Sequence, residues 1–504
     1  MFLARELFQV AAKQFQTENG VGPNRFISAA VPFASALLFV SHPIQTQAVT
    51  YISQRYTSLA ACLYLAAVYA FLRFRQELLV GNDKFSWLWG TLTILSAVCA
   101  MKSKEIAFTL PLMLALFECL LFKGRLLKKP LVSIAGIALL LLVPLQFMWM
   151  SAAVPSGGSF LDHAVKASSE TALITRHDYF VTQLRVIVTY IRLMLFPVAQ
   201  NVDYDYPLYH SVFDPHVLFA VAVHFVLVAS VVLQAVRNRA VDGEMSASSR
   251  VIVLGICWFY LALSVESSFI PIRDYINEHR LYLPSVGFLI AGVTWVARVS
   301  DRLNRQRQFF YGTVVLCAVL SVATVARNRI WRSEMSLWQD TLLKSPAKGR
   351  PHHSIGKLLY KQWKPEQAIP YLLRAVELEP KKILYRMTLN ETLALTNRFE
   401  GRLAPGGAYP QGTAPGDTYE KMTWLAASHN NLGLAYEGIT GNWNLARQQY
   451  ELSVQLNPDF DLGWYNLALL LNRQNDPAGT ATALEHLRAL NPALAEKAVQ
   501  RFSR

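Results

Sequence analysis

A run of charged and polar side chains stands directly before an apolar segment at residues 277–288. The run reads Asn277-Glu278-His279-Arg280-Leu281-Tyr282-Leu283-Pro284-Ser285-Val286-Gly287-Phe288, with Arg273, Asp274 and Tyr275 just upstream. Charge at the edge of an apolar segment is costly unless it is paired or faces water. Two interpretations are open: an ordinary polar cap on a membrane helix, or a site that holds an anionic, lipid-bound substrate at the membrane surface.

A second cationic turn lies at residues 101–105. Lys102 and Lys104 place two ammonium groups beside the carboxylate of Glu105, between two apolar segments. Ammonium groups in this position would stabilise a pyrophosphate or a phosphodiester without a dedicated phosphate loop. Pairing of these cations, and of Arg280, with nearby carboxylates such as Glu105 and Asp274 is the structural alternative.

The segment that follows the first apolar run is polar. Pro43 stops that run, and the next residues provide hydroxyl, amide and guanidinium groups that suit a sugar or a phosphate. These groups belong to Thr46, Thr50, Ser53, Gln54 and Arg55. His42 stands at the start of the segment, either as a base or as a hydrogen-bonded histidine at the membrane interface.

Two carboxylates, Asp203 and Asp205, stand two residues apart in the segment 201–207, next to Tyr204. Contact with an acceptor or with a divalent cation is one interpretation. The other is a surface turn that begins at an aspartate and ends at Pro207.

The composition places these residues in a membrane protein. Hydrophobic residues make up 53% of the 504 residues and charged residues only 16%. Apolar runs near the length that crosses about 30 Å of hydrocarbon predict nine spans. They lie at about 26–40, 57–74, 85–101, 106–124, 130–150, 214–236, 251–269, 281–299 and 309–326.

Basic residues recur in alternate loops, which is the positive-inside pattern. If residues 1–25 are cytoplasmic, the opposite face carries residues 41–56, the turn at 102–105, residues 151–213, residues 270–280 and the tail from about 327. The net charge of +14 then reflects this bias and contact with anionic lipid, so nucleic-acid binding is a poor interpretation.

An amphipathic helix is predicted at residues 178–197, after a Pro/Gly/Ser loop at 155–159. Apolar residues recur at spacings of three and four from Phe180 to Met194, and Pro197 ends the pattern. A helix that lies in the membrane interface fits this pattern. A tenth full span is the alternative.

The tail predicts tetratricopeptide repeats. Pro346 and Pro380 stand 34 residues apart, as do Pro458 and Pro492, which is the period of this repeat. Small residues, among them Gly356, Ala368, Ala375, Gly433, Ala446 and Ala468, occupy positions where paired helices approach closely. Residues 401–417 read as an exposed insertion. We expect a membrane domain at 1–331 and a short repeat domain at 332–504 whose concave face can hold an extended peptide. A structural spacer is the alternative.

Other chemistries find little support. All five cysteines fall in apolar runs, so neither a disulfide framework nor a cysteine metal cluster is expected. The sequence has no phosphate-binding loop, dinucleotide fingerprint, nucleophile elbow or zinc-protease motif in a suitable context.

Taken together, these motifs resemble the transmembrane and tetratricopeptide-repeat O-mannosyltransferases and their bacterial relatives, from about residue 27 onward. The segment 278–288 and the order of the domains are specific, and the segments 42–55, 104–105 and 203–207 add to them. The resemblance implies an all-α membrane helix bundle of the GT-C type. It implies an enzyme in the bacterial cytoplasmic membrane with its repeat domain in the periplasm.

The implied reaction moves one hexose from a polyprenyl-phosphate carrier to a Ser or Thr hydroxyl of a protein. Under this hypothesis Lys102, Lys104 and Arg280 hold the lipid phosphate, and Glu105 or Glu278 orients them. His279, Arg55 and His42 support the site, and Asp203, Tyr204 and Asp205 face the acceptor or the sugar. No residue is assigned to a bound metal, although a divalent cation is an open alternative as cofactor.

One feature of the family is missing. Its members carry an acidic motif in the first outer loop after a first transmembrane helix, and this chain has no matching motif. We therefore assign no catalytic base. We expect a start assigned too far downstream together with a truncated or degenerate copy, and the use of another carboxylate is the alternative. The alternative function is a non-catalytic membrane anchor that presents a repeat scaffold to protein partners.

Overall fold

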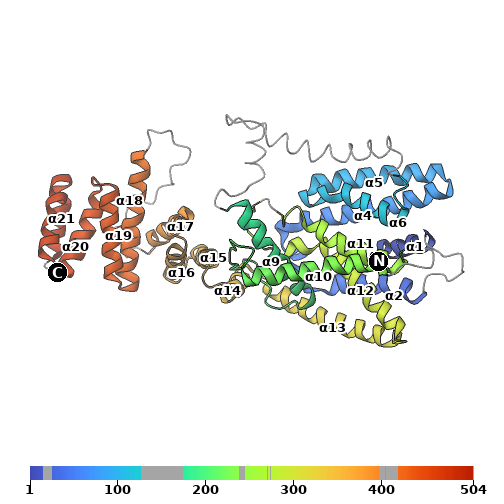
Figure 1. Cartoon of the computed structure of the whole chain (residues 1–504). Helices are drawn as coiled ribbons and strands as arrows, with labels where there is room; N and C mark the ends of the chain where they lie inside the picture. The colour runs from blue at the N-terminus through green and yellow to red at the C-terminus, as the bar shows by residue number, and fades with distance from the viewer. Residues whose placement is uncertain are drawn as a thin grey trace. The chain divides into compact units, whose positions relative to one another are not determined.

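The protein is predominantly helical in the residues that its computed structural model describes. These are residues 1–14, 25–126, 174–237, 245–268, 271–272, 274–396, 403 and 418–502. Their regular elements are all helices, so the predicted all-α fold is confirmed. The chain divides into two compact units, Met1–Arg332 and Ser333–Arg504 (Figure 1).

The first unit is a bundle of long helices joined by short helical turns. Its long helices are α1 (Phe2–Gln14), α2 (Arg25–Ser41), α4 (Arg55–Val80), α5 (Asp83–Ser103), α6 (Leu110–Phe122), α9 (Arg176–Leu195), α10 (Pro215–Arg237), α11 (Ala247–Leu263), α12 (Pro284–Arg302) and α13 (Gln306–Ile330). Its short elements are η1 (Pro43–Gln45), α3 (Thr46–Thr50), η2 (Ile52–Gln54), η3 (Glu105–Thr109) and η4 (Glu278–Leu281).

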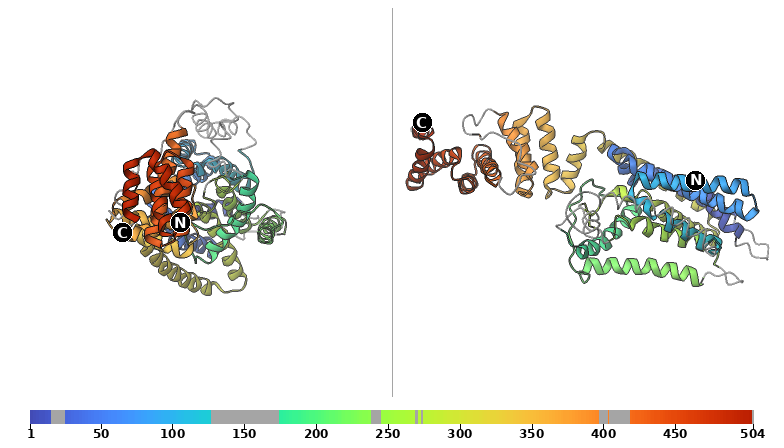
Figure 2. Two further views of the ribbon diagram at one scale, coloured as in Figure 1. Left: turned by 90° about the vertical axis from the view of Figure 1, so that its left-hand side faces the viewer. Right: turned by 90° about the horizontal axis from the view of Figure 1, so that it is seen from above.

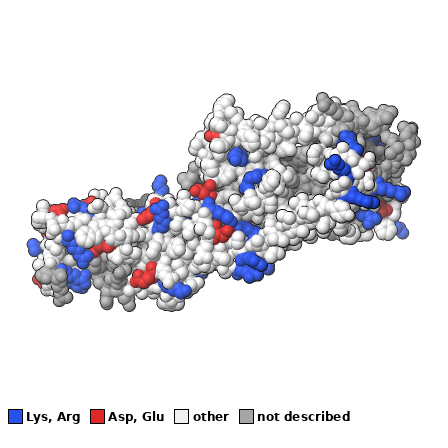
Figure 3. Space-filling view, turned by 90° about the horizontal axis from the view of Figure 1, so that it is seen from below, with Lys and Arg blue, Asp and Glu red and all other residues white. Residues whose placement is uncertain are grey.

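Five helical segments of the described chain are long and apolar enough to cross a membrane. They are Ile52–Val80, Asp83–Ser103, Glu105–Phe122, Pro215–Val236 and Gln306–Ile330. A sixth follows if Arg25–Ser41 and Pro43–Thr50, which are bent by 54° at His42, form one broken span. In Figure 3, a broad band without charged side chains crosses this unit. The first unit is therefore an integral membrane domain.

This number of candidate spans is lower than the nine predicted. The predicted span at 130–150 lies outside the described residues. The run at 251–269 forms the shorter apolar helix α11, and the run at 281–299 forms α12, which is not among the five. Polar residues such as Ser285, Thr294 and Arg298 dilute its apolar character, and much of its surface is buried within the bundle.

Helices α11 and α12 touch backbone to backbone at two glycines. A Cβ atom on Gly255 would lie 2.5 Å from the Gly287 carbonyl oxygen, and one on Gly287 would lie 2.6 Å from the Gly255 oxygen. Only glycine permits so close an approach. The indole N–H of Trp258 on α11 also donates to the Leu283 carbonyl at 3.2 Å. These contacts fix the position of the start of α12, and with it the position of η4, which precedes α12 in the chain.

The predicted amphipathic helix is present as α9, which begins at Arg176 and ends at Leu195. Side chains on the inner face of α9 donate hydrogen bonds to the backbone of the segment that precedes η4. The Gln183 amide donates to the Tyr275 carbonyl at 2.9 Å, while the Tyr190 hydroxyl donates to the Asn277 carbonyl at 3.1 Å. The loop predicted before this helix, at 155–159, lies outside the described residues. A position at the membrane interface remains a prediction.

The second unit is a row of helical hairpins (Figures 1 and 2). Its elements are α14 (Glu334–Lys344), α15 (Gly349–Lys361), α16 (Pro365–Leu378), α17 (Ile383–Ala394), α18 (Thr418–Ala435), the π-helical turn η5 (Tyr436–Thr440), α19 (Trp443–Leu456), α20 (Asp461–Arg473), α21 (Pro477–Leu490) and α22 (Pro492–Phe502).

Small residues stand where the paired helices of this unit meet, as the repeat pattern predicted. A Cβ atom on Gly356 would lie 2.6 Å from the Leu372 side chain, and one on Gly433 would lie 2.5 Å from the ring of Tyr450. Ala368 is fully buried. The insertion predicted at 401–417 lies outside the described residues except for Leu403.

The glycine contact between α11 and α12 gives a stability prediction. We expect Gly287→Ala to lower the free energy of unfolding by about 1–3 kcal/mol, because the added methyl group forces the helices apart. Gly292→Ala on the same helix is the control, because a Cβ there has no neighbour within 4 Å. Thermal unfolding of the detergent-solubilised protein measures both. Equal midpoints for the two variants would contradict the packing argument.

Candidate functional site

The polar segments singled out in the sequence converge at one end of the membrane unit. Residues 278–281 form η4, and the segment 200–206 and the bend at 42–50 pack against it through hydrogen bonds. Lys104 joins them from the turn between α5 and η3. A cluster of buried polar groups results, and its centre is a pair of cations.

Lys104 and Arg280 share one carboxylate, that of Glu266. The Lys104 ammonium lies 3.2 Å from Glu266 Oε1, and Arg280 Nε lies 3.8 Å from the same oxygen. All three side chains are buried. Buried charges are stable only when they are paired and hydrogen-bonded. The three groups together carry a net charge of +1, so the cluster remains electropositive after pairing.

Backbone and side-chain contacts hold both cations in place. Arg280 donates from its two terminal nitrogens to the carbonyl oxygens of Tyr275 at 3.1 Å and Asp274 at 3.0 Å. Lys104 donates to the Thr57 hydroxyl at 3.1 Å. The partners of Arg280 precede it directly in the chain, whereas Thr57 lies on α4, so the position of Lys104 depends on the packing of α4 against the end of α5.

Glu266 is fixed from the side of α9. The Tyr179 hydroxyl donates to its backbone carbonyl at 2.7 Å. Neither residue was identified from the sequence, although Glu266 gave a signal: it is the one carboxylate in the apolar run at 251–269. An acidic residue in such a run needs a cationic partner, and that rule would have pointed to Glu266.

His279 is buried next to the two cations. Its backbone N–H donates to Gln47 Oε1 at 2.7 Å, and its Nδ1 has no hydrogen-bond partner among the described residues. Burial, together with the charges of Lys104 and Arg280, lowers the pKa of His279 to about 2. The imidazole is therefore neutral at physiological pH, and it could accept or donate one hydrogen bond to a ligand.

Glu278 holds the segment 200–204 rather than the cations. Its carboxylate accepts hydrogen bonds from the Asn201 backbone N–H at 2.6 Å, the Tyr204 hydroxyl at 2.7 Å and the Gln200 amide at 3.0 Å. Burial raises the pKa of Glu278, while Arg327 and these three donors act in the opposite direction. Glu278 thus ties this segment to η4.

The two aspartates predicted for the acceptor side differ in environment. Asp203 is buried, and its backbone carbonyl accepts from the Asn201 amide at 3.2 Å. Asp205 is exposed. The described part of the chain contains no group of three or more His, Cys, Asp or Glu side chains that could bind a metal ion. Tyr204, between the aspartates, is engaged with Glu278.

His42 shapes the bend in the first outer segment. The N–H of Ile44 donates to His42 Nδ1 at 3.1 Å, so Nε2 carries the proton that is donated to the Met194 carbonyl at 3.0 Å. Both ring nitrogens are engaged, as expected for the hydrogen-bonded alternative. The other predicted side chains outside the cluster are exposed: Arg55, Lys102 and Glu105.

Comparison with known proteins confirms the resemblance, although no family model matches the chain. Protein O-mannosyl-transferase TMTC3 of Mus musculus is 23% identical over 92% of this chain and 52% of its own length. Protein O-mannosyl-transferase Tmtc3 of Drosophila melanogaster is 23% identical over 88% of this chain, and human protein O-mannosyl-transferase TMTC1 is 22% identical over 71%. The chain spans about half the length of these relatives.

The shared carboxylate gives a direct test of the cluster. We expect Glu266→Gln to destabilise the protein by about 3–5 kcal/mol, because two buried cations lose their counter-charge. Glu105→Gln is the control: this carboxylate is exposed, and the change should stay within about 0.5 kcal/mol. Chemical unfolding in detergent measures both variants. A Glu266→Gln protein as stable as the Glu105→Gln protein would show that the carboxylate is not needed.

The lowered pKa of His279 predicts a pH dependence of stability. Between about pH 2 and 6.5 the unfolded chain binds this proton and the folded protein does not. Folding therefore becomes less favourable as the pH drops below 6.5, by about 1.4 kcal/mol at pH 5.5. His279→Asn removes this contribution. Unfolding of both proteins at pH 7.5 and 5.5 measures the difference, and identical pH dependence in the two would refute a neutral, buried His279.

Proposed function

We propose that this protein is a membrane glycosyltransferase that moves a sugar from a polyprenyl-phosphate carrier to a Ser or Thr hydroxyl of a protein. The observation that carries the proposal is the buried cation pair of Lys104 and Arg280 at the end of the membrane helices. The relatives support it, since each is named a protein O-mannosyl-transferase. Mannose is accordingly the sugar to test first.

The cation pair suits the leaving group of this reaction. The acceptor oxygen attacks the anomeric carbon of the sugar, the bond from that carbon to the phosphate oxygen breaks, and the lipid phosphate leaves with the electron pair. Charge therefore increases on the phosphate in the transition state. Fixed cations in a site that excludes water stabilise such charge without reorganising.

Pre-organisation of the pair is the role we give to Glu266. It keeps Lys104 and Arg280 close together in the absence of substrate, at the cost of neutralising one positive charge. A phosphate monoanion or diester that enters the cluster meets a net positive charge and can take over contacts made to the carboxylate. We place Lys102, exposed at the end of α5, at the outer edge of this phosphate site.

The neutral imidazole of His279 lies beside the proposed phosphate, and its free Nδ1 can bond to the sugar or to the phosphate. The acceptor would approach from the segment that contains Asp203 and Tyr204, which Glu278 ties to the same turn. We assign no general base. The proton of the acceptor hydroxyl must leave through a group on that side.

The second unit would present the acceptor protein. It contains a cavity of about 500 Å³ near α14, α15 and α16, lined in part by the amides of Gln339, Gln362 and Gln367 and by Tyr371. Amide side chains can bond to both the N–H and the C=O groups of an extended peptide. We propose that this unit stands on the outer face of the membrane, opposite the basic loops.

Removal of either cation tests the donor site. We expect Arg280→Ala and Lys104→Ala each to weaken binding of polyprenyl-phosphate mannose at least tenfold, because each loses a charge-assisted contact worth about 1.5–3 kcal/mol. The exposed residue Lys84 is the control, and Lys84→Ala should bind as the unaltered protein does. Equilibrium binding to the purified full chain is the measurement.

Arg280→Lys serves as a second variant, since it keeps the charge if the alanine variant does not fold. Unchanged binding in the folded Arg280 and Lys104 variants would remove the assignment. Binding of the carrier without transfer of mannose to Ser- and Thr-containing peptides would favour the scaffold alternative instead.

A further inference from the structure

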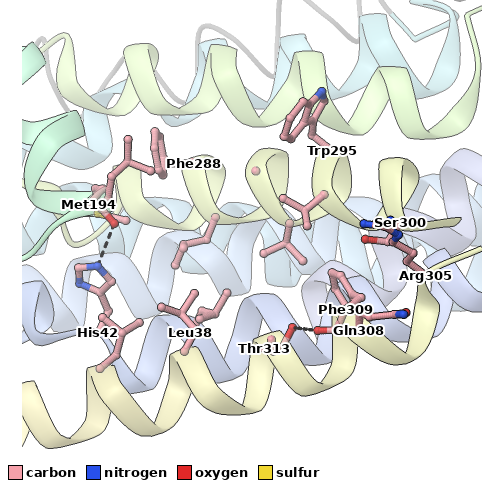
Figure 4. Close-up of a pocket in the computed structure, with 18 residues that line it drawn as sticks. Leu38, His42, Met194, Phe288, Trp295, Ser300, Arg305, Gln308, Phe309 and Thr313 are labelled. Atoms are coloured by element: carbon pink, nitrogen blue, oxygen red, sulfur yellow. Dashed lines mark hydrogen bonds between the residues drawn. The ribbon is translucent and has the colours of Figure 1, made fainter. Parts of the chain in front are cut away.

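An apolar groove runs along the membrane unit, apart from the cation cluster. Its volume is about 560 Å³, within the range of about 300–1,000 Å³ that is usual for ligand pockets. Helices α2, α12 and α13 form its walls, and the end of α9 closes one end (Figure 4). Neither Lys104 nor Arg280 lines it, so the groove is separate from the proposed donor-phosphate site.

Two glycines keep the groove open. Gly292 on α12 and Gly312 on α13 both line it, and a Cβ atom on either would have no neighbour within 4 Å. Gly255 and Gly287, by contrast, are pressed against a neighbouring helix. The space beside Gly292 and Gly312 is therefore not required for helix packing. It is available to an apolar ligand.

The length of the groove matches one leaflet of a bilayer. Its lining on α12 extends from Phe288 to Ser300, and twelve residues of α-helix rise by about 18 Å. Half of a hydrocarbon core is about 15 Å. An acyl chain of a lipid would fill such a groove along its length, and the lining between the ends is almost entirely aliphatic or aromatic.

The two ends of the groove differ in charge. Arg305 and Gln308 lie at one end, and His42 and Met194 lie at the other (Figure 4). Arg305 is exposed and makes no ion pair with any described residue. Two further exposed arginines, Arg302 and Arg307, flank it. At the opposite end His42 has both ring nitrogens engaged, so the described residues that line this end include no cation.

We propose that this groove binds one anionic phospholipid. Its acyl chain lies between α12 and α13, and its phosphate meets Arg305 at the end of the groove. The positive charge at the Arg305 end argues against the polyprenyl-phosphate carrier as the occupant of the groove, because the phosphate of that carrier would lie at the cluster of Lys104 and Arg280. By the positive-inside pattern, the lipid belongs to the leaflet on the side of the basic loops.

Retention of lipid by the full chain tests this proposal. The detergent-purified protein is incubated with phosphatidylglycerol or phosphatidylcholine, and native mass spectrometry counts the lipids that remain bound. We expect one phosphatidylglycerol per chain, held at least about fivefold more strongly than phosphatidylcholine. Equal retention of the two lipids would overturn the proposal.

Variants separate the groove from the general lipid-facing surface. Gly292→Leu with Gly312→Leu fills the groove and should abolish retention. Val322→Leu, on an exposed part of α13 outside the groove, should not change it. Arg305→Gln should abolish the preference for phosphatidylglycerol over phosphatidylcholine, while Arg307→Gln, which does not line the groove, should keep it. If the double variant Gly292→Leu with Gly312→Leu retained as much phosphatidylglycerol as Val322→Leu, the assignment of the lipid to the groove would be overturned.

A competition experiment distinguishes the phospholipid from the carrier. Polyprenyl phosphate should not displace the bound phosphatidylglycerol, and the filled variant should still bind polyprenyl-phosphate mannose. Displacement by polyprenyl phosphate, together with loss of carrier binding in the filled variant, would instead make the groove the site of the carrier chain.

Discussion

The site depends on the need of two buried cations for a counter-charge. Lys104 and Arg280 come from segments more than 170 residues apart, and both contact Glu266, which lies just after the end of α11. Without that carboxylate, mutual repulsion and loss of hydration would oppose burial of either cation. The pairing therefore brings α5, α11 and η4 together. It also leaves a net positive charge, which is the property a phosphate site needs.

The segment 277–288 contains two functions in one short sequence. Its first half, with Glu278, His279 and Arg280, belongs to the polar cluster. Its second half is structural: Gly287 lies against Gly255, and Ser285 accepts a hydrogen bond from the Gln45 amide at 3.1 Å. The backbone contact of α12 with α11 holds the start of α12, and so the polar half, at a fixed position. The structure thus gives a packing reason for part of a motif that the sequence suggested was chemical.

The sequence predicted the features that follow from local pattern. The helical fold, the membrane segment, the amphipathic helix α9 and the repeat hairpins all follow from hydrophobic periodicity and length. The polar segments were identified too, but their contacts were not. Glu105 was a candidate to orient the cations because it is adjacent in sequence, yet it is exposed, and the partner is Glu266. Contacts between distant segments depend on helix packing, which a single sequence does not encode locally.

Two glycines of α12 have different roles that depend on the neighbouring helix rather than on local sequence. Gly287 and Gly292 stand five residues apart on α12, and hydrophobic periodicity alone does not distinguish their packing. One is glycine because another backbone lies 2.6 Å from where its Cβ would be, whereas the other has no neighbour within 4 Å. In a membrane helix a small residue can serve close packing, or it can leave space for a lipid. The rotation between the two positions, about 500° and so about 140° around the helix, directs them to different faces. Gly287 faces the backbone of α11, whereas Gly292 faces the groove that α12 forms with α13, and this difference determines which role each plays.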